Sequence, residues 1–313
     1  MIISASRRTD IPAFYAPWLM TRLRAGWCEV PNPFNSAQVS RVDLSPAAVD
    51  GLVFWTRFPR PMLCYLDELE TMGHAFYFLF TLTGYPRSLD ARGPSLDAAV
   101  RVFRDLAERI GSHRVRWRYD PIVFAHGLDA DYHRRRFEAL AKRLEEATER
   151  VIVSVLEPYA KARRRLTDVP GIELDKDRLT ALAGSLLPDL ADMARASSMQ
   201  MDGCALWESL EPIARDAGIV PSRCVDPELV ARLSGRPVES ARDGSQRPRC
   251  GCAPSRDIGM YESCGFGCRY CYATQRFDAA DANRRAHDPE APALLGTRKD
   301  AAAAPHADQH SLL

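Results

Sequence analysis

The sequence predicts an α/β fold in which a parallel sheet curls into a full or partial (β/α) barrel of the TIM type, with a cluster-bearing strand at the C-terminus. Short apolar segments typical of strands alternate with amphipathic segments typical of helices along nearly all of the 313 residues. This alternation favours parallel strands joined by crossover helices. The number of repeats approaches the eight of a closed barrel, which favours a curled sheet. An open doubly wound sheet is the alternative.

The expected strands are short runs rich in apolar residues. The first, 2–6, ends in the polar cluster 7–10, and the fourth, 115–120, is closed by Pro121. Such features are typical of buried strands bounded by turns. We expect strands at 2–6, 52–56, 76–82, 115–120, 151–156, 199–206 and 257–261.

The expected helices have apolar residues three and four positions apart. Phe14, Trp18 and Leu19 fit this spacing, and Pro17 lies early in the segment, where a helix tolerates proline. Gly111 is placed to end another helix. We expect helices at 14–26, 63–72, 98–110, 132–148, 179–196 and 227–233, and a turn-rich segment at 31–36.

Changes in composition divide the chain into three parts. Residues 1–235 carry the strand and helix repeats of the barrel. Residues 236–296 contain a polar segment typical of an exposed linker, followed by a cysteine-rich iron–sulfur segment that we expect to complete the barrel. From 297 to 313 the composition turns to Ala, His, Asp and Pro, which predicts a disordered tail.

Charge and apolar content exclude several classes of protein. The net charge is +1, so we expect no global attraction to nucleic acid or to an acidic partner. There is no run of eighteen apolar residues and no charged segment before an apolar stretch at the N-terminus, so we expect neither a membrane-spanning nor a secreted protein. Five of the nine cysteines lie between 250 and 271, which favours metal ligation in a reducing cytoplasm.

Cys264, Cys268 and Cys271 form a C-x3-C-x2-C motif, with Tyr270 directly before the last cysteine. Glycines between the cysteines let the backbone curl so that the sulfur atoms converge. Three thiolates rather than four would leave one iron of a [4Fe-4S] cluster without a protein ligand. The alternative is zinc, whose structural sites take four ligands, so that a further cysteine would complete the set.

This motif, its aromatic residue included, resembles the cluster motif of the radical S-adenosylmethionine enzymes. The resemblance implies that the open iron chelates the amino and carboxylate groups of S-adenosylmethionine. Reduction by an electron donor such as flavodoxin or ferredoxin then yields a 5′-deoxyadenosyl radical, with the cofactor carrying the chemistry and the protein positioning it. The substrate, a small molecule or a molecule of another class, does not follow from the motif.

Four further cysteines are candidates for an auxiliary site. Cys250 and Cys252 flank a glycine twelve residues before the motif, and Cys224 and Cys204 bring the count to four. Four thiolates without an open position would suit a second iron–sulfur cluster or zinc. Cys204 alternatively serves as a small buried apolar residue.

Charged and polar residues stand where predicted strands end, and in barrels the chemistry lies at the carboxyl ends of the strands. We predict catalytic roles for Arg8, Asp10, Arg118 and Asp120, and cofactor-binding roles for Arg7, Thr56, Glu157 and Tyr270. Residues two apart point to the same face of a strand, so a structural ion pair between Arg118 and Asp120 is the competing hypothesis.

Two arginine-rich tracts, 133–136 and 163–165, give slight support to a nucleic-acid partner. The first is followed by acidic residues on the same predicted helix, so a solvated helix face is the stronger interpretation.

Several segments resemble an uncharacterised bacterial family, the domain of unknown function 1848. They are 2–12, 32–35, 53–56, 117–121 and the C-terminal cysteine block. The resemblance implies a C-terminal cysteine cluster similar to the one that radical S-adenosylmethionine enzymes carry near the N-terminus. In a closed ring of βα units the first and last strands are neighbours, so the strand at 257–261 would lie beside the one at 2–6.

Three hypotheses for function follow. The first is a radical S-adenosylmethionine-type enzyme, and the second is a non-catalytic protein that binds zinc or a structural iron–sulfur cluster. The third, with weaker support, is a radical enzyme that modifies nucleic acid.

Overall fold

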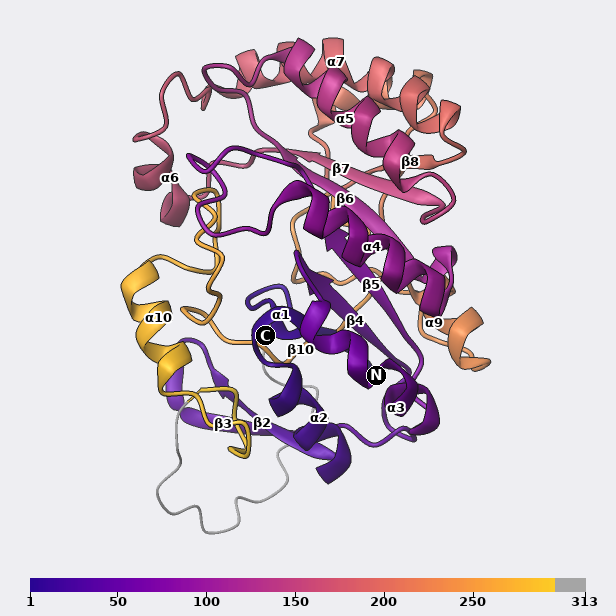
Figure 1. Ribbon diagram of the computed structural model, residues 1–313, viewed down its shortest axis with the longest axis vertical. Coiled ribbons are helices and arrows are strands. Elements are labelled where there is room, and N and C mark those ends of the chain that lie inside the picture. Colours follow the sequence, from indigo (N-terminus) through magenta and orange to yellow (C-terminus); the bar gives the residue numbers. More distant parts are fainter. Residues whose placement is uncertain (296–313) are drawn as a thin grey trace.

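A computed structural model describes residues 1–295 and contains an eight-stranded sheet in which every pairing is parallel (Figure 1). The strands run in the order β10-β1-β4-β5-β6-β7-β8-β9. Because β10 and β9 form the two edges, the barrel is partial, one of the two forms that the sequence predicts. The strands are β1 (Ile2–Ala5), β4 (Gly51–Thr56), β5 (Phe76–Thr81), β6 (Val115–Ile122), β7 (Arg150–Val155), β8 (Gln200–Gly203), β9 (Val220–Pro221) and β10 (Arg256–Asp257).

The C-terminal strand β10 lies beside the N-terminal strand β1, as predicted. Ile3 pairs with Arg256 and Ser4 with Asp257. The strand ends at Asp257 instead of extending to 261. The side chain of Asp257 accepts the amide of Gly259 at 3.0 Å, and this bond turns the chain away from the ladder.

Helices connect the strands, and most of them cover the outer face of the sheet (Figure 1). The helix at 227–234 instead packs through Leu229 and Val230 against the other face, beside Val53 and Tyr77. The helices are α1 (Ile11–Phe14), α2 (Ala16–Ala25), α3 (Leu66–Thr71), α4 (Leu96–Ile110), α5 (Ala130–Leu144), α6 (Ala160–Leu166), α7 (Lys176–Ala196), α8 (Glu211–Asp216), α9 (Pro227–Ser234) and α10 (Phe277–Arg285), with short 3-10 helices η1 (Arg60–Tyr65), η2 (Ser112–Arg114) and η3 (Glu208–Leu210). In the described part of the chain, no helix combines the length and the apolar character needed to cross a bilayer.

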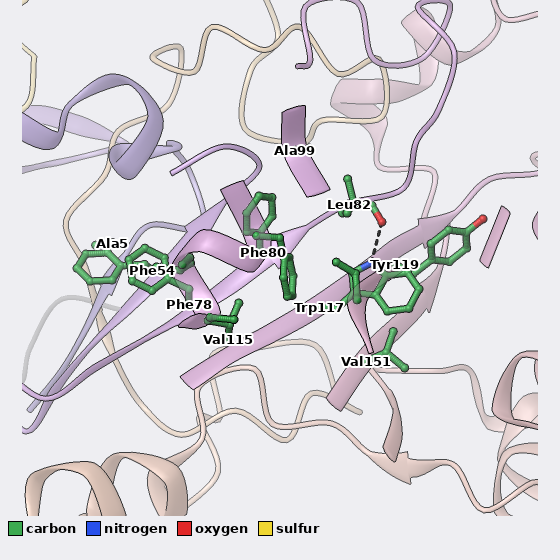
Figure 2. Packing of buried hydrophobic residues seen from close by; sticks show 14 of the residues in the cluster. Ala5, Phe54, Phe78, Phe80, Leu82, Ala99, Val115, Trp117, Tyr119 and Val151 are labelled. Atoms are coloured by element: carbon green, nitrogen blue, oxygen red, sulfur yellow. Dashed lines mark hydrogen bonds between the residues drawn. The ribbon is translucent and has the colours of Figure 1, made fainter. Parts of the chain in front are cut away.

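The two faces of the sheet are packed differently. On the outer face Phe54, Phe78, Phe80 and Trp117 belong to the main core with the covering helices (Figure 2). The opposite side chains, such as Tyr77, contact the C-terminal segment that carries Cys224, Cys250 and Cys252. The C-terminal segment therefore fills the inner side of the partial barrel.

The predicted helix at 14–26 is broken at Tyr15 into α1 and α2. Tyr15 leaves the helical conformation two residues before Pro17, which is in the first turn of α2. Its hydroxyl donates to the carbonyl of Ser263 at 2.7 Å. A proline is accommodated best in a first turn, where no intrahelical N–H is required.

The segment at 31–36, predicted as turns, belongs to an antiparallel hairpin of β2 (Trp27–Asn32) and β3 (Asn35–Asp43). The prolines of this segment favoured turns over strands in the prediction. Proline has no N–H group to donate to a neighbouring strand, so within sheets it is found mainly in edge strands. Strand β8 ends at Gly203, short of the predicted 206, since Ala205 adopts a positive φ of 47°. The tail predicted for 297–313 lies outside the described residues.

Candidate functional site

All residues predicted for the site line one cavity of about 1100 Å³ at the carboxyl ends of the strands. Chain segments from both termini form its walls. The lining residues include the candidates Arg7, Arg8, Asp10, Thr56, Arg118, Asp120, Glu157, Tyr270, Cys204, Cys224, Cys250, Cys252, Cys264, Cys268 and Cys271. A cavity of this size exceeds the usual 300–1,000 Å³ of small-molecule sites, so it has room for a cofactor and a second molecule.

The loop with Cys264, Cys268 and Cys271 is held in place by Arg165 of α6. This guanidinium donates to the carbonyl oxygens of Arg269, Cys271 and Gln275. Multiple bonds from one planar guanidinium restrict the orientation of the loop. Gly267 has a φ of 67°, a conformation that other residues rarely adopt, and this allows the chain to curl between the cysteines.

The three loop thiols differ in exposure, since Cys268 is buried whereas Cys264 and Cys271 are partly exposed. Burial raises the pKa of Cys264 to about 12, and also raises the pKa of Cys268. The neighbouring charge of Arg57 acts in the opposite direction on Cys268. The Cys271 sulfur accepts a hydrogen bond from the amide of Ala273 at 3.3 Å. Thiolates here therefore need a positive partner to offset the cost of burial.

Tyr270, the aromatic residue of the motif, belongs to a buried polar network with Arg57 and Asp90. Its hydroxyl donates to the Asp90 carboxylate at 2.7 Å and accepts from Arg57. Arg57 also forms an ion pair with Asp90, and Thr83 donates to the same carboxylate at 3.3 Å. The network fixes the orientation of the Tyr270 side chain at the cavity wall.

The Asp10 side chain connects the end of β1 to the end of β4. One carboxylate oxygen accepts the amide of Ala13 at 3.0 Å and caps α1, and the other accepts the amide of Arg57 at 2.6 Å. Burial raises the pKa of Asp10 to about 6, although these hydrogen bonds favour its ionised form. Thr56, beside it, accepts the amide of Phe58 at 3.1 Å.

Arg118 and Asp120 form an ion pair on one face of β6. Ser154 of β7 donates to the other oxygen of Asp120. The structural ion pair expected from their spacing is therefore present, and both residues still line the cavity. Glu157, two residues after the end of β7, accepts a hydrogen bond from the indole N–H of Trp207 at 3.1 Å.

Arg7 and Arg8 follow β1 and differ in their partners. The Arg8 guanidinium lies 3.6 Å from the Asp257 carboxylate and 5.4 Å from the centre of the Tyr261 ring. Arg7 donates to the neutral hydroxyl of Ser255 at 3.0 Å. Among the described residues, Arg7 makes no salt bridge with a carboxylate.

The four remaining candidate cysteines gather on the inner side of the sheet. The sulfur atoms of Cys204 and Cys224 are 3.7 Å apart, and the sulfur of Cys252 accepts the amide of Val225 at 3.3 Å. The hydrogen bond from Cys224 lowers the pKa of Cys204 to about 7, helped by the charge of Arg118. Hydrogen bonding with Cys252 raises the pKa of Cys250.

The side chains as they stand do not form a closed metal site. Within residues 1–295, no three His, Cys, Asp or Glu side chains are placed to hold a metal ion. The donor set nevertheless has the chemistry of an iron–sulfur site, since three thiols on one loop line one cavity and Cys268 lies beside the cation of Arg57.

The two arginine tracts are used only in part inside the fold, since Arg135, Arg163 and Arg164 are exposed. His133 is buried and bonded to Tyr119, and Arg134 pairs with Asp131 and Asp189. Arg165 serves the cysteine loop, as described above. These contacts lend no support to a nucleic-acid surface.

Sequence reasoning missed four residues that shape the site: Trp55, Asp90, Arg165 and Asp257. Asp90 and Arg165 lie outside the strand ends, and no local pattern distinguishes them from surface charges. Trp55 could have been predicted from the sequence as a site residue, since it is a large aromatic residue directly before a predicted strand end.

Comparison with known proteins identifies the family. The sequence profile of the "Domain of unknown function (DUF1848)" matches residues 2–273. The chain belongs to the DUF1848 family. No curated protein matches the sequence.

Two solved structures share a partial likeness with this DUF1848 chain. One is titled "IOLI protein with a binding zinc atom", at 13% identity and a TM-score of 0.31, over 49% of this chain and 53% of that one. This chain thus spans about half of its length. The other is a deoxyribose phosphate aldolase from Aeropyrum pernix, also at 13% identity and a TM-score of 0.31, over 61% of this chain and 71% of that one.

Proposed function

We propose that the chain is an iron–sulfur enzyme of the radical S-adenosylmethionine type. One observation carries the proposal: the three-cysteine loop and the charged strand ends line a single cavity at the carboxyl edge of the sheet. This is the edge at which barrel folds place their chemistry. Cys264, Cys268 and Cys271 would hold a [4Fe-4S] cluster, and the open iron would bind S-adenosylmethionine. When bound and reduced by flavodoxin or ferredoxin, these groups supply a 5′-deoxyadenosyl radical.

The contribution of the chain itself is to position and shield these groups. Arg165 orients the loop through its carbonyl oxygens, and the network of Arg57, Asp90 and Tyr270 holds the loop against the wall of the cavity. Thr56 and Glu157 lie on the same lining and are our candidates for cofactor contacts. Arg8, Asp10, Arg118 and Asp120 are the candidate catalytic groups, because charges in such a cavity require a polar ligand or a partner.

Anaerobic reconstitution with iron and sulfide tests the proposal. We expect brown protein with iron and sulfide in near equal amounts, which forms 5′-deoxyadenosine from S-adenosylmethionine after reduction. Cys268→Ala should lose the cluster. Cys64→Ala is the matched control, since Cys64 is exposed on η1 and away from the cavity lining. Colourless protein with one tightly bound zinc would overturn the proposal.

A second candidate function, a non-catalytic zinc protein, is favoured by one specific distance. Around a zinc ion with bonds of about 2.3 Å, tetrahedral geometry separates two sulfur atoms by about 3.8 Å. The sulfur atoms of Cys204 and Cys224 are 3.7 Å apart, and Cys250 and Cys252 line the same cavity. Under this hypothesis Cys204→Ser lowers the zinc content while Cys268→Ala does not, and no 5′-deoxyadenosine forms with any variant.

A further inference from the structure

The indole of Trp55 on β4 contacts the guanidinium groups of two arginines, one after β1 and one on β6. The central carbon of Arg7 is 5.3 Å from the centre of the ring, and that of Arg118 is 4.9 Å from it. Contacts of this kind between guanidinium groups and aromatic rings are favourable and hold the side chains in a defined orientation. We call these three residues the Arg–Trp–Arg cluster.

Each member of the Arg–Trp–Arg cluster has a buried N–H group without an acceptor among the described residues. The groups are Nη2 of Arg7, Nε1 of Trp55 and Nε of Arg118. A buried donor left without an acceptor destabilises a protein. Three such donors on side chains that line one cavity indicate that a ligand supplies the missing acceptors.

The charges around the cluster favour an anionic ligand. Arg118 is paired with Asp120, but Arg7 makes no salt bridge to a carboxylate within the described residues, and its Nη1 group donates to the hydroxyl of Ser255. Asp257, a carboxylate whose charge acts on Arg7, already accepts from Ser4, Ser6 and two backbone amides. Within the described residues Arg7 therefore has the Ser255 hydroxyl and the Cys252 thiol as direct neighbours, and no carboxylate salt bridge.

We propose that the Arg–Trp–Arg cluster binds a carboxylate or phosphate group of the substrate. A planar guanidinium that donates two parallel hydrogen bonds matches both groups. The inference rests on the proposed function for the identity of the bound molecule as substrate. It assigns Arg7 to the substrate, whereas its position at a strand end alone predicts a role toward the cofactor. A cavity of about 1100 Å³ has room for both molecules.

Isothermal titration calorimetry on the full-length protein tests this inference without turnover. The probes are inorganic phosphate and succinate, each titrated at constant ionic strength because exposed charges are screened by salt. We expect Arg7→Gln to weaken binding about tenfold or more, as the loss of a charge-assisted hydrogen bond implies. Trp55→Phe keeps an aromatic ring, although a smaller one, removes the N–H group and should weaken binding severalfold. Arg178→Gln, on the exposed face of α7, is the control and should bind like the wild type.

Two outcomes would overturn the inference. One is equal binding by the wild type, Arg7→Gln and Trp55→Phe in proteins with unchanged circular dichroism. The other is displacement of S-adenosylmethionine by phosphate, since the cluster would then hold the carboxylate of the cofactor. Phosphate binding by protein that takes up no iron would contradict the proposed enzyme and leave the anion site intact. The experiment therefore distinguishes a failure of the proposed radical enzyme from a failure of the proposed anion site.

Discussion

The carboxylate of Asp257 accepts a hydrogen bond from the hydroxyl of Ser4 at 2.8 Å, across the pairing of β10 with β1. Ser6 donates to the same carboxylate at 2.8 Å, and the amide of Arg7 at 2.7 Å. One buried acidic group thus connects the last strand of the sheet to the first. It also sets the direction in which the chain enters the cysteine loop.

Asp257→Ala should lower the free energy of unfolding by on the order of 3 kcal/mol, because several buried donors lose their acceptor at once. Urea denaturation measures the change. Asp278→Ala, at an exposed position on α10, is the control and should leave the midpoint unchanged. A loss of less than 1 kcal/mol in the Asp257 variant would mean that β10 is held by its backbone pairing alone.

Arg165→Ala should loosen the cysteine loop with little effect on the rest of the fold. The carbonyl oxygens of Arg269, Cys271 and Gln275 lose a common donor. We expect faster amide hydrogen exchange over 269–275, measured by mass spectrometry. Arg164→Ala, an exposed neighbour on α6, should exchange like the wild type. Unchanged exchange in both variants would show that other contacts suffice to order the loop.

Tyr270→Phe tests the network at the cavity wall. The substitution retains the ring and its contact with Tyr85 but leaves Asp90 and Arg57 without their hydroxyl partner. A loss of about 1–3 kcal/mol in unfolding free energy is expected for an unsatisfied buried group. Thermal and urea unfolding provide the measurement, with Tyr65→Phe on η1 as control. Equal stability of the two variants would contradict the role assigned to the hydroxyl.

His133 should make the protein less stable in acid. Its Nε2–H donates to the carbonyl of Val123 at 3.0 Å, so Nδ1 accepts from the hydroxyl of Tyr119 at 2.8 Å and the ring is neutral. Burial lowers the pKa of His133 from 6.5 to about 4. Below pH 6.5 the unfolded chain binds more protons than the folded one, so stability falls as the pH falls toward 4.

The expected contribution of His133 is a loss of about 2 kcal/mol between pH 7 and pH 5. His133→Gln keeps a donor and an acceptor but does not titrate, so its stability should depend less on pH over this interval. His113→Gln, at an exposed position, should retain the wild-type dependence. Urea unfolding at both pH values gives the difference directly. Parallel pH profiles for wild type and His133→Gln would refute the assignment.

Arg8→Gln and Asp120→Asn test the candidate catalytic groups. Both variants should fold and, if the proposed cluster forms, should bind iron like the wild type, because neither side chain is a candidate ligand. We expect formation of 5′-deoxyadenosine to fall at least tenfold in each. Asparagine at 120 retains the shape of the side chain and can still accept from Ser154. A variant that loses stability but keeps its activity per folded molecule would identify that residue as part of the scaffold.

Local patterns in the sequence determined the fold class and the composition of the site. The alternation of apolar strands with amphipathic helices was enough to predict a curled parallel sheet, because both patterns reflect short-range periodicity and burial. The spacing of Cys264, Cys268 and Cys271 marked the loop, and the polar ends of the strands marked the cavity lining. The prediction that the C-terminal strand lies beside β1 assumed a closed ring, and the pairing is confirmed in a sheet whose edges are β10 and β9.

Only the tertiary structure decided which side chains meet across the cavity. Trp55 contacts both Arg7 and Arg118 because the strands that carry or precede them end at the same edge of the sheet. The hydroxyl of Tyr270 donates to Asp90, which is 180 residues away in the sequence. Such contacts depend on packing between distant segments, and no periodicity in the sequence records them. The prolines of the β2–β3 hairpin illustrate the same limit, since pairing with a partner strand overrode a local preference for turns.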